Sequence, residues 1–373
     1  MRIGIDARFY GSVGKGLGRY TEKLITHLEK IDQQNQYFIF LTRENFGEYQ
    51  PKNKNFQKVL ANYRWYTLAE QIYFPRMLRS YRLDLVHFPH FNVPLLYCGK
   101  FVVTIHDLIL LHFPTRRGST LGTVHYWFKF RMYRIVIWSA IRRSIAVIAV
   151  SRFTRDDVLQ HYPIAKNKIV VTYEACDFPD GVPSEEADVK ILATYGILRP
   201  YILYVGNAYP HKNLELLIAA FTEILKAHPT LHLVLVGKID YFYERVKRFV
   251  AEQGVANVVF TEFIPDTELN AVYRNAEMYV FPSQYEGFGL PPLEAMANGV
   301  PVLAANHPCM REILGDSAQF FESQNLQALV SATQQLLSDG VLRKTLVERG
   351  NQQVRCYSWK KMAEETLGVY LHA

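Results

Sequence analysis

The chain has 373 residues, of which 49% are hydrophobic and 21% charged, and its formal net charge is +7. This composition excludes a disordered or collagen-like chain, and the length predicts two domains, because one core rarely serves more than about 250–300 residues. The apolar runs are far shorter than the ~20 residues that cross a bilayer, and no secretion signal or cysteine pair is evident, so we expect a cytoplasmic protein with reduced thiols.

The first half of the chain alternates short apolar strands with helices. Residues 2–8 predict a strand, which a glycine-rich turn connects to a helix from about Arg19 to Lys30. Further strands are predicted at 37–43, 83–90, 101–107, 145–151 and 168–173, with a helix at 65–78. Nearly continuous apolar strands are typical of a parallel sheet that is covered on both faces.

A second alternating series begins after residues 174–190, where prolines, a glycine and acids interrupt the pattern. Strands are predicted at 201–207, 231–238, 257–263, 278–283, 301–306 and 318–323, and helices are predicted to start near Leu214, Tyr243, Asp266, Leu290, Cys309 and Leu326. We therefore expect an α/β protein with Rossmann-like, doubly wound domains at 1–176 and 196–356, a linker at 177–195, and a terminal helix at 357–373 that packs back toward the first domain. The two domains are expected to face a central cleft.

The segment EGFGLPPLE separates Glu286 from Glu294 by seven uncharged residues. It follows a predicted strand and opens a helix, whose free amides and dipole favour a phosphate. Gly287 and Gly289 allow the backbone to approach a ligand closely. Each carboxylate would then accept hydrogen bonds from hydroxyl groups on one side of a diphosphate, which predicts a sugar at one end and a ribose at the other. The alternative is a favourable acid in a first helical turn and an ordinary loop acid.

Three further loops follow predicted strands. In YVGNAYPHKN, Lys212 would be a point charge beside phosphates, and Asn213 would cap a helix. In TIHDL, His106 can hydrogen-bond a sugar hydroxyl, while Asp107 can shape the loop. The loop GKGLGRY, at residues 14–20, is by itself a weak glycine pattern that close packing alone would also explain.

Taken together, these motifs resemble those of the retaining glycosyltransferases of family 4, which have the GT-B fold, over essentially the whole chain. The resemblance implies an acceptor-side first domain and a nucleotide-sugar-binding second domain. It implies catalytic or donor-sugar roles for Glu286, His106 and Lys212, and donor binding by Glu294 through the ribose. The implied further donor contacts are Gly16, Gly18, Asn207, Phe288, Gly289, Leu290 and Ile264, and Arg19 and Asp107 are placed on the acceptor side. Asn207 departs from the family pattern, because many members have an arginine there.

The resemblance also implies retention at the anomeric carbon by front-face attack, with the departing phosphate helping to deprotonate the acceptor. Because no Asp-x-Asp sequence occurs and no His, Cys and Asp cluster has metal-ligand spacing, we expect no metal and no other cofactor. Overall likeness favours the bacterial mannosyltransferases of O-antigen synthesis, with GDP-mannose as donor. UDP-glucose, UDP-galactose and UDP-N-acetylglucosamine stay open as donors.

Residues 116–143 are aromatic and basic and contain no acid. Such a segment can lie on an anionic membrane surface at the inner face of the plasma membrane, which would suit a lipid-linked saccharide acceptor; it can equally be a core helix with a solvated basic face. A nucleotide-sugar epimerase and a non-catalytic nucleotide-sugar binding protein are the alternatives from other classes. A nucleic-acid partner is not expected, because no recognised nucleic-acid-binding module accompanies the basic residues.

Overall fold

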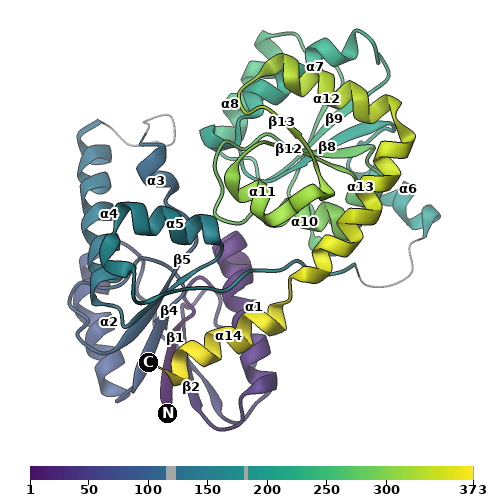
Figure 1. Ribbon diagram of the computed structural model, residues 1–373. Helices are drawn as coiled ribbons and strands as arrows, with labels where there is room; N and C mark the ends of the chain where they lie inside the picture. The colour runs from purple at the N-terminus through teal and green to yellow at the C-terminus, as the bar shows by residue number, and fades with distance from the viewer. Residues whose placement is uncertain (115–122, 180–183, 373) are drawn as a thin grey trace. The chain divides into compact units, whose positions relative to one another are not determined.

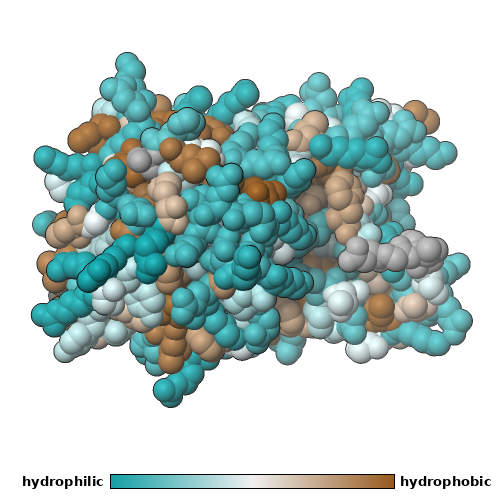
Figure 2. Space-filling model, turned by 90° about the horizontal axis from the view of Figure 1, so that it is seen from below, coloured by the Kyte–Doolittle hydropathy of each residue, from teal (hydrophilic) through white to brown (hydrophobic). Residues whose placement is uncertain are grey.

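The computed structural model describes residues 1–114, 123–179 and 184–372, which form two compact units. Unit 1 comprises the described residues of Met1–His112, Leu121–Glu174 and Ser358–Ala373, and unit 2 comprises those of Phe113–Thr120 and Ala175–Tyr357. Within the described ranges, no helix combines the length and the hydrophobicity that a bilayer crossing requires. The face shown in Figure 2 is mostly hydrophilic, with apolar side chains in separate patches.

Unit 1 is built on a parallel sheet with the strand order β3-β2-β1-β4-β5-β6-β7. The strands are β1 (Arg2–Asp6), β2 (Gln36–Leu41), β3 (Phe56–Leu60), β4 (Leu85–Phe88), β5 (Phe101–Ile105), β6 (Ala146–Ala149) and β7 (Ile169–Val171). The α-helices are α1 (Lys15–Ile31), α2 (Leu68–Ser80), α3 (Ile109–His112), α4 (Thr123–Arg143), α5 (Arg152–His161) and α14 (Trp359–Leu371), and the short 3-10 helices are Gly11–Gly14 and Pro163–Ala165.

Helices cover both faces of this sheet, which explains why its strands are continuous apolar runs. Every residue of β5 is buried. Side chains of α2, α4 and α5 share one core with strands β2 to β6. Helix α14 packs against α1 on the other side of the sheet (Figure 1). The last helix of the chain therefore completes the unit that contains the first strand.

Unit 2 has a parallel sheet with the order β10-β9-β8-β11-β12-β13. Its strands are β8 (Tyr201–Val205), β9 (His232–Val236), β10 (Val258–Glu262), β11 (Met278–Phe281), β12 (Val302–Ala305) and β13 (Gln319–Phe321). Its helices are α6 (Glu185–Thr194), α7 (Leu214–Leu225), α8 (Tyr241–Glu252), α9 (Asp266–Arg274), α10 (Leu290–Ala297), α11 (Pro308–Leu314), α12 (Leu326–Ser338) and α13 (Gly340–Gln353), with short 3-10 helices at Pro210–Lys212, Gly315–Ser317 and Val354–Cys356.

Helix α6 lies in the range 177–195 that the sequence assigns to a linker. It is anchored to unit 2, because Asp188 accepts a hydrogen bond from the Arg274 Nε of α9 over 2.6 Å. Ser184 caps the helix by accepting from the Ala187 amide. The acids that look like linker composition are thus a helix start, where negative charge is favoured by the dipole.

In both sheets the first strand lies inside, and the chain crosses over it to continue on the other side. This switch of direction falls between β1 and β4 in unit 1 and between β8 and β11 in unit 2. Ligands of doubly wound sheets bind beyond the carboxyl ends of the strands at such switch points. The loops after these strands are therefore where functional side chains are expected.

Candidate functional site

The two loops at the switch point of unit 2 are joined to each other. The loop after β8 contains the turn Pro210–Lys212, and the loop after β11 contains Glu286. The Gln284 amide of the second loop donates to the His211 carbonyl of the first over 2.8 Å. The sequence motifs PHKN and EGFGLPPLE, which lie far apart in the chain, are thereby brought side by side.

Lys212 and Glu286 form a buried ion pair at this place. The Lys212 Nζ lies 2.5 Å from the Glu286 Oε1, and the two side chains are only 13% and 10% exposed. The Ser283 hydroxyl donates to the same carboxylate. Burial by itself would raise the pKa of Glu286, but the positive charge of Lys212 and these hydrogen bonds outweigh it, and the pKa lies below its usual value. Glu286 is thus an ionised acceptor.

His211 lies beside this pair and is buried. Burial and the neighbouring Lys212 charge lower its pKa to about 4, against a smaller opposing effect of Glu286. At neutral pH the imidazole is therefore uncharged, so that Lys212 supplies the positive charge of this loop.

The start of helix α10 offers backbone donors next to the ion pair. Gly289 is its N-cap with φ 93°, a backbone conformation that other residues adopt only with strain. Pro291 and Pro292 lack amide hydrogens, which leaves the amides of Gly289 and Leu290 as the first donors of the helix. The predicted phosphate site therefore depends on a narrow set of backbone groups.

The side chains of Glu294 and Phe288, at the start of α10, have different contacts. Glu294 accepts a hydrogen bond from the Tyr273 hydroxyl over 3.0 Å, which orients the carboxylate from α9. Phe288 is buried and packs edge-on against Tyr357, with 5.5 Å between ring centroids. The Phe288 side chain thus anchors the loop, and any donor contact at this residue would come from its backbone.

The remaining predicted positions of unit 2 are backbone sites rather than charged groups. The Asn207 carbonyl accepts from the Tyr204 hydroxyl over 2.7 Å. Asn213 is the N-cap residue of α7, as predicted, but it adopts a left-handed conformation, φ 59°, and its side chain makes no capping bond. Ile264 is buried between β10 and α9. Position 207, where many family members have an arginine, thus carries an uncharged asparagine.

In unit 1, His106 follows β5 and is held through both ring nitrogens. Its Nδ1 lies 2.9 Å from the Glu174 carboxylate and its Nε2 2.9 Å from the Pro89 carbonyl. Burial would lower the pKa of His106, but the hydrogen bond to Glu174 and its charge reverse this effect, and the pKa is raised. Both partners are acceptors, so this geometry favours the imidazolium form, in which each ring nitrogen donates. A contact with a sugar hydroxyl would require exchange of one of these bonds.

Asp107, the neighbour of His106, shapes the loop as the sequence suggests. Its Oδ1 accepts from the Ile109 amide over 3.0 Å, at the start of α3. The role of Asp107 visible in unit 1 is therefore to cap a short helix.

The glycine-rich segment of unit 1 is partly helical, since Gly16 and Gly18 lie inside α1. A Cβ at Gly18 would meet the Gly11 carbonyl oxygen at 2.0 Å, whereas one at Gly16 would meet nothing within 4 Å. Arg19 is a partly exposed residue of the same helix. Packing thus explains the glycine at 18, and the glycine at 16 has no such explanation.

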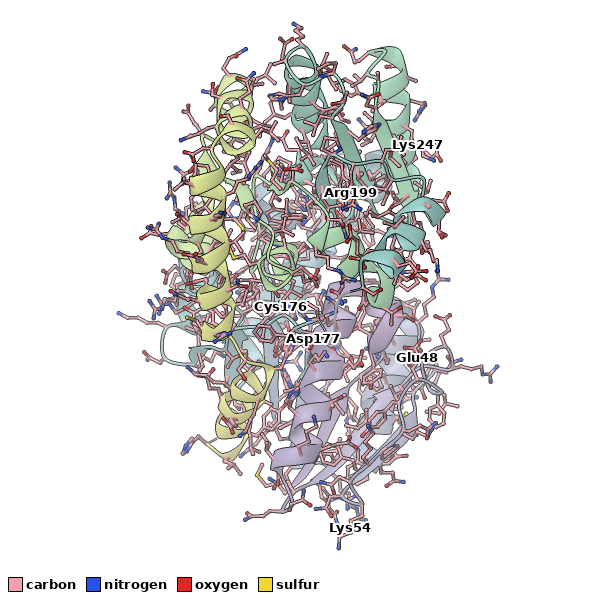
Figure 3. The ribbon with its side chains drawn as sticks, turned by 90° about the vertical axis from the view of Figure 1, so that its right-hand side faces the viewer. Glu48, Lys54, Cys176, Asp177, Arg199 and Lys247 are labelled. Carbon is pink, nitrogen blue, oxygen red and sulfur yellow. The ribbon has the colours of Figure 1, made fainter. Side chains whose placement is uncertain are left out.

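Three acids with no role predicted from the sequence support this region. Glu48, labelled in Figure 3, accepts from the Ser12 hydroxyl over 2.8 Å and so fixes the turn before α1. Glu70 and Asp6 flank the fully buried Arg8, with N–O distances of 2.7 Å to each. No local spacing reveals Glu70 as a partner of Arg8, because the two residues are 62 positions apart.

Helix α4 has two faces. Its buried face joins the core through residues such as Tyr133, Ile137 and Ile141. Its exposed face is aromatic and basic, with Phe128 65% exposed and no acid anywhere in the helix. That exposed face consists of Trp127, Phe128, Arg131, Arg134, Ile135, Trp138 and Arg142, and Lys129 is exposed on another side of the helix. Residues 116–122 of the predicted membrane segment lie outside the described residues.

The GT-B fold consists of two Rossmann-like units, and unit 2 of this chain carries the Lys212–Glu286 pair at its switch point. The family profiles described as "Glycosyltransferase Family 4" and "Glycosyl transferases group 1" match residues 14–178 and 198–353 of the chain. The protein belongs to glycosyltransferase family 4.

Two similar proteins match along nearly their whole length. The chain is 27% identical over 376 residues to "O-antigen chain mannosyltransferase B" of Escherichia coli, covering 95% of each chain. It is 25% identical to "O-antigen chain mannosyltransferase RfbU" of Salmonella typhimurium, covering 89% of this chain and 91% of that protein. These relatives are similar to this chain at a distance at which donor preference can change.

Solved structures show the same fold at lower identity. Sucrose-phosphate synthase from Thermosynechococcus elongatus superimposes with a TM-score of 0.76 at 20% identity, covering 100% of this chain and 98% of that one. HepE from Anabaena in complex with UDP-glucose superimposes with a TM-score of 0.73 at 16% identity, covering 98% and 99%. The predicted GT-B fold is confirmed.

Proposed function

We propose that this glycosyltransferase transfers mannose, with retention, from GDP-mannose to a saccharide acceptor in the synthesis of a bacterial surface polysaccharide. The mannosyl donor is supported by the names of the two full-length relatives, both O-antigen chain mannosyltransferases. The observation that carries transfer from a nucleotide sugar is the Lys212–Glu286 pair beside the start of α10. It combines a cation, backbone donors and an ionised acceptor, which are the groups that a sugar diphosphate needs.

In this proposal the diphosphate of the donor lies at the start of α10. The amides of Gly289 and Leu290 and the ammonium of Lys212 stabilise the negative charge that develops as the glycosidic bond to phosphate breaks. Glu286 accepts hydrogen bonds from the sugar hydroxyls, and Glu294 accepts them from the ribose. Lys212 and these amides can carry the charge neutralisation by themselves, so we propose a transfer that needs no metal.

The proposed acceptor is linked to a lipid, and the exposed face of α4 supports contact with a membrane. Trp127 and Trp138 are 47% and 46% exposed, and the helical period places them on the same face as three basic residues, Arg131, Arg134 and Arg142. Aromatic rings favour the interfacial region, and Lys and Arg near an anionic surface contribute about 1 kcal/mol each. This combination favours an anionic bilayer surface over bulk water.

The test is thermal unfolding of the protein with GDP, UDP, ADP and dTDP in turn, followed by turnover of the corresponding sugar nucleotides. A nucleotide at ~100 times its dissociation constant stabilises the folded state by about 2.7 kcal/mol. We expect the largest rise in melting temperature with GDP. Selective stabilisation by UDP would replace the donor by a UDP-sugar, as in the HepE complex, and leave the site unchanged. No response to any nucleotide would contradict the nucleotide-sugar site itself.

A further inference from the structure

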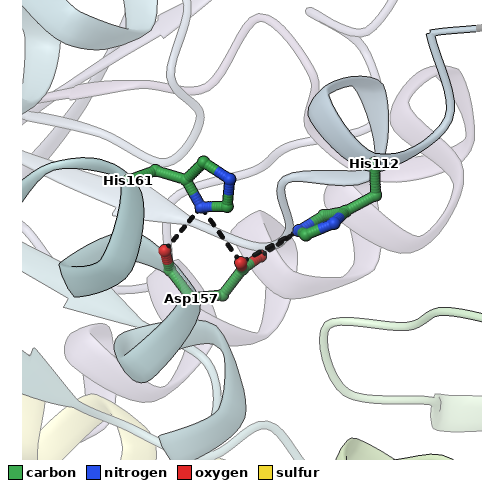
Figure 4. A group of neighbouring side chains, drawn as sticks. All are labelled: His112, Asp157 and His161. Atoms are coloured by element: carbon green, nitrogen blue, oxygen red, sulfur yellow. Dashed lines mark hydrogen bonds and ion pairs between the residues drawn. The ribbon is translucent and has the colours of Figure 1, made fainter.

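A second cluster of polar side chains lies in unit 1, on the outer ends of two helices. His112 is the last residue of α3, and Asp157 and His161 lie on α5 (Figure 4). One ligand atom from each of the three lies within 4.8 Å of the other two. Asp157 is buried at the centre, while the His112 and His161 side chains are 33% and 32% exposed.

The three side chains are held together by hydrogen bonds and ion pairs, whose distances are slightly shorter than those between neighbouring metal ligands. The His112 Nε2 lies 2.9 Å from both carboxylate oxygens of Asp157, and the His161 Nδ1 lies 3.2 Å from the Asp157 Oδ1. Ligand atoms of a tetrahedral zinc site with bonds of about 2.0–2.1 Å lie ~3.3 Å apart. The two imidazoles are each about one third exposed, so they can rotate until one nitrogen of each ring binds the same ion.

The local backbone presents these ligands together. Asp157 and His161 are separated by one helical turn, so both side chains lie on the same face of α5. His112 comes from 45 residues earlier and faces Asp157 from α3. The His161 Nδ1 also lies 2.9 Å from the Asp157 carbonyl. This bond holds the His161 ring beside Asp157, and binding a metal through Nδ1 would replace it.

We propose that His112, Asp157 and His161 bind one divalent transition-metal ion of the zinc class, with water completing its coordination. Two imidazoles and one carboxylate favour Zn²⁺, Co²⁺ and Ni²⁺ over Mg²⁺ and Ca²⁺, which prefer oxygen ligands. Two neutral imidazoles and one carboxylate leave the bound ion with a net charge of +1. The ion would stabilise its site without taking part in glycosyl transfer.

The ion would tie α3 to α5 at the loop that carries His106. Asp107 caps the start of α3, and the Thr154 hydroxyl of α5 donates to the His106 carbonyl over 3.1 Å. A metal ion bound by His112 and α5 would therefore attach the C-terminal end of segment 107–112 to α5. The consequence is a more rigid backbone behind His106 in the metal-bound protein.

Equilibrium dialysis of tag-free protein against Zn²⁺ and Co²⁺ tests the site, with metal content measured per chain. We expect one ion per chain, and His112→Gln and His161→Gln each to lower the affinity at least about tenfold. His27→Gln is the matched control, because the His27 Nδ1 makes the same bond, 2.8 Å, to the carbonyl one turn before it, on α1. This control should leave the affinity unchanged.

The visible spectrum of the Co²⁺ protein provides a second readout that misfolding cannot imitate. Ligand-field bands of a low-coordinate nitrogen and oxygen site are expected in the wild type and in His27→Gln, and their loss is expected in His112→Gln at unchanged melting temperature of the metal-free protein. Absence of binding in the wild type, or equal affinity in all four proteins, would overturn the proposal. Neither result would bear on the nucleotide-sugar site, because no donor is present in the measurement.

Discussion

The Lys212 ammonium donates to the Glu286 carboxylate across 74 residues of sequence, and each of the two side chains removes the other from water. The ion pair thus joins the PHKN and EGFGLPPLE motifs. A diphosphate at α10 would compete with Glu286 for the same ammonium. Donor binding and the ion pair are therefore coupled.

Breaking this pair on one side should destabilise unit 2. Lys212→Met leaves Glu286 ionised and buried without its cation, which typically costs about 3–5 kcal/mol. The double variant Lys212→Met/Glu286→Met removes both charges and should recover most of that loss. Urea unfolding of the three proteins measures the difference. If the single variant were as stable as the wild type, the pair would contribute nothing to the fold.

The two glutamates should separate binding from turnover. Glu294→Gln weakens an acceptor of ribose hydroxyl groups, and a hydrogen bond to a charged group contributes about 1.5–3 kcal/mol, so the Kd for the free nucleoside diphosphate should rise about 10-fold to 100-fold. Glu286→Gln should lower kcat, because Glu286 is the proposed acceptor for the sugar hydroxyls, and should not raise that Kd, because loss of the competing carboxylate charge leaves Lys212 available to the diphosphate. Calorimetric titration with the diphosphate and steady-state kinetics with the donor distinguish the two. If Glu294→Gln and Glu286→Gln changed Kd and kcat to the same extent, the assignment of one glutamate to the ribose and the other to the sugar would be wrong.

The raised pKa of His106 predicts a pH-dependent contribution to stability. Its pKa is higher in the folded state than the usual ~6.5, so the stabilisation is complete below that pH and is lost as the pH rises through the folded pKa. Glu174→Gln removes the carboxylate that raises the pKa. We expect the stability difference between wild type and Glu174→Gln to shrink between pH 6 and pH 9, as measured by denaturant unfolding. A difference that stayed constant over this range would show that His106 is not the group that titrates.

Gly16 and Gly18 provide a matched pair inside one helix. Gly18→Ala places a Cβ against the Gly11 and Phe9 carbonyls, at 2.0 and 2.6 Å, and should destabilise the protein by about 1–3 kcal/mol. Gly16→Ala has open space and should stabilise α1 by roughly 0.5–1 kcal/mol. Melting temperatures check both. A stabilised Gly16→Ala variant with reduced turnover would place the Gly16 backbone at the donor or acceptor.

The exposed face of α4 should bind anionic vesicles. Phe128→Ser and Trp138→Ser remove aromatic contact without disturbing the core face of the helix, and we expect a several-fold loss of binding to vesicles with anionic headgroups at unchanged stability. Tyr241, which is 49% exposed on α8 of unit 2, supplies the control Tyr241→Ser. Sedimentation with vesicles at low and high salt measures the effect. If the wild type bound neutral and anionic vesicles equally well, the electrostatic part of the proposal would be contradicted.

The strands were largely predictable because a strand buried on both faces is a short continuous run of apolar residues. Strand β3 has only two buried positions, Phe56 and Val59, and helix α13 has only two, Leu346 and Gly350, so neither produces such a run. The residues at the strand ends were also predictable, as His106, Lys212 and Glu286 show. Their partners were not, because Glu174 lies 68 residues from His106 and only the folded sheet brings them together.

The Tyr370 hydroxyl of α14 forms a buried hydrogen bond of 2.6 Å with the His87 Nδ1 of β4, and the two residues are 283 positions apart in the sequence. Domains of a growing chain commonly fold in order of synthesis, the N-terminal one first. Here α1 and β4 leave the ribosome long before α14 exists, whereas Ala175–Tyr357 supplies nearly all of unit 2 in one stretch. Synthesis of unit 1 therefore begins before that of unit 2 and ends after it. Until α14 is synthesised, the surface of α1 that it covers is exposed to solvent or is bound by another protein.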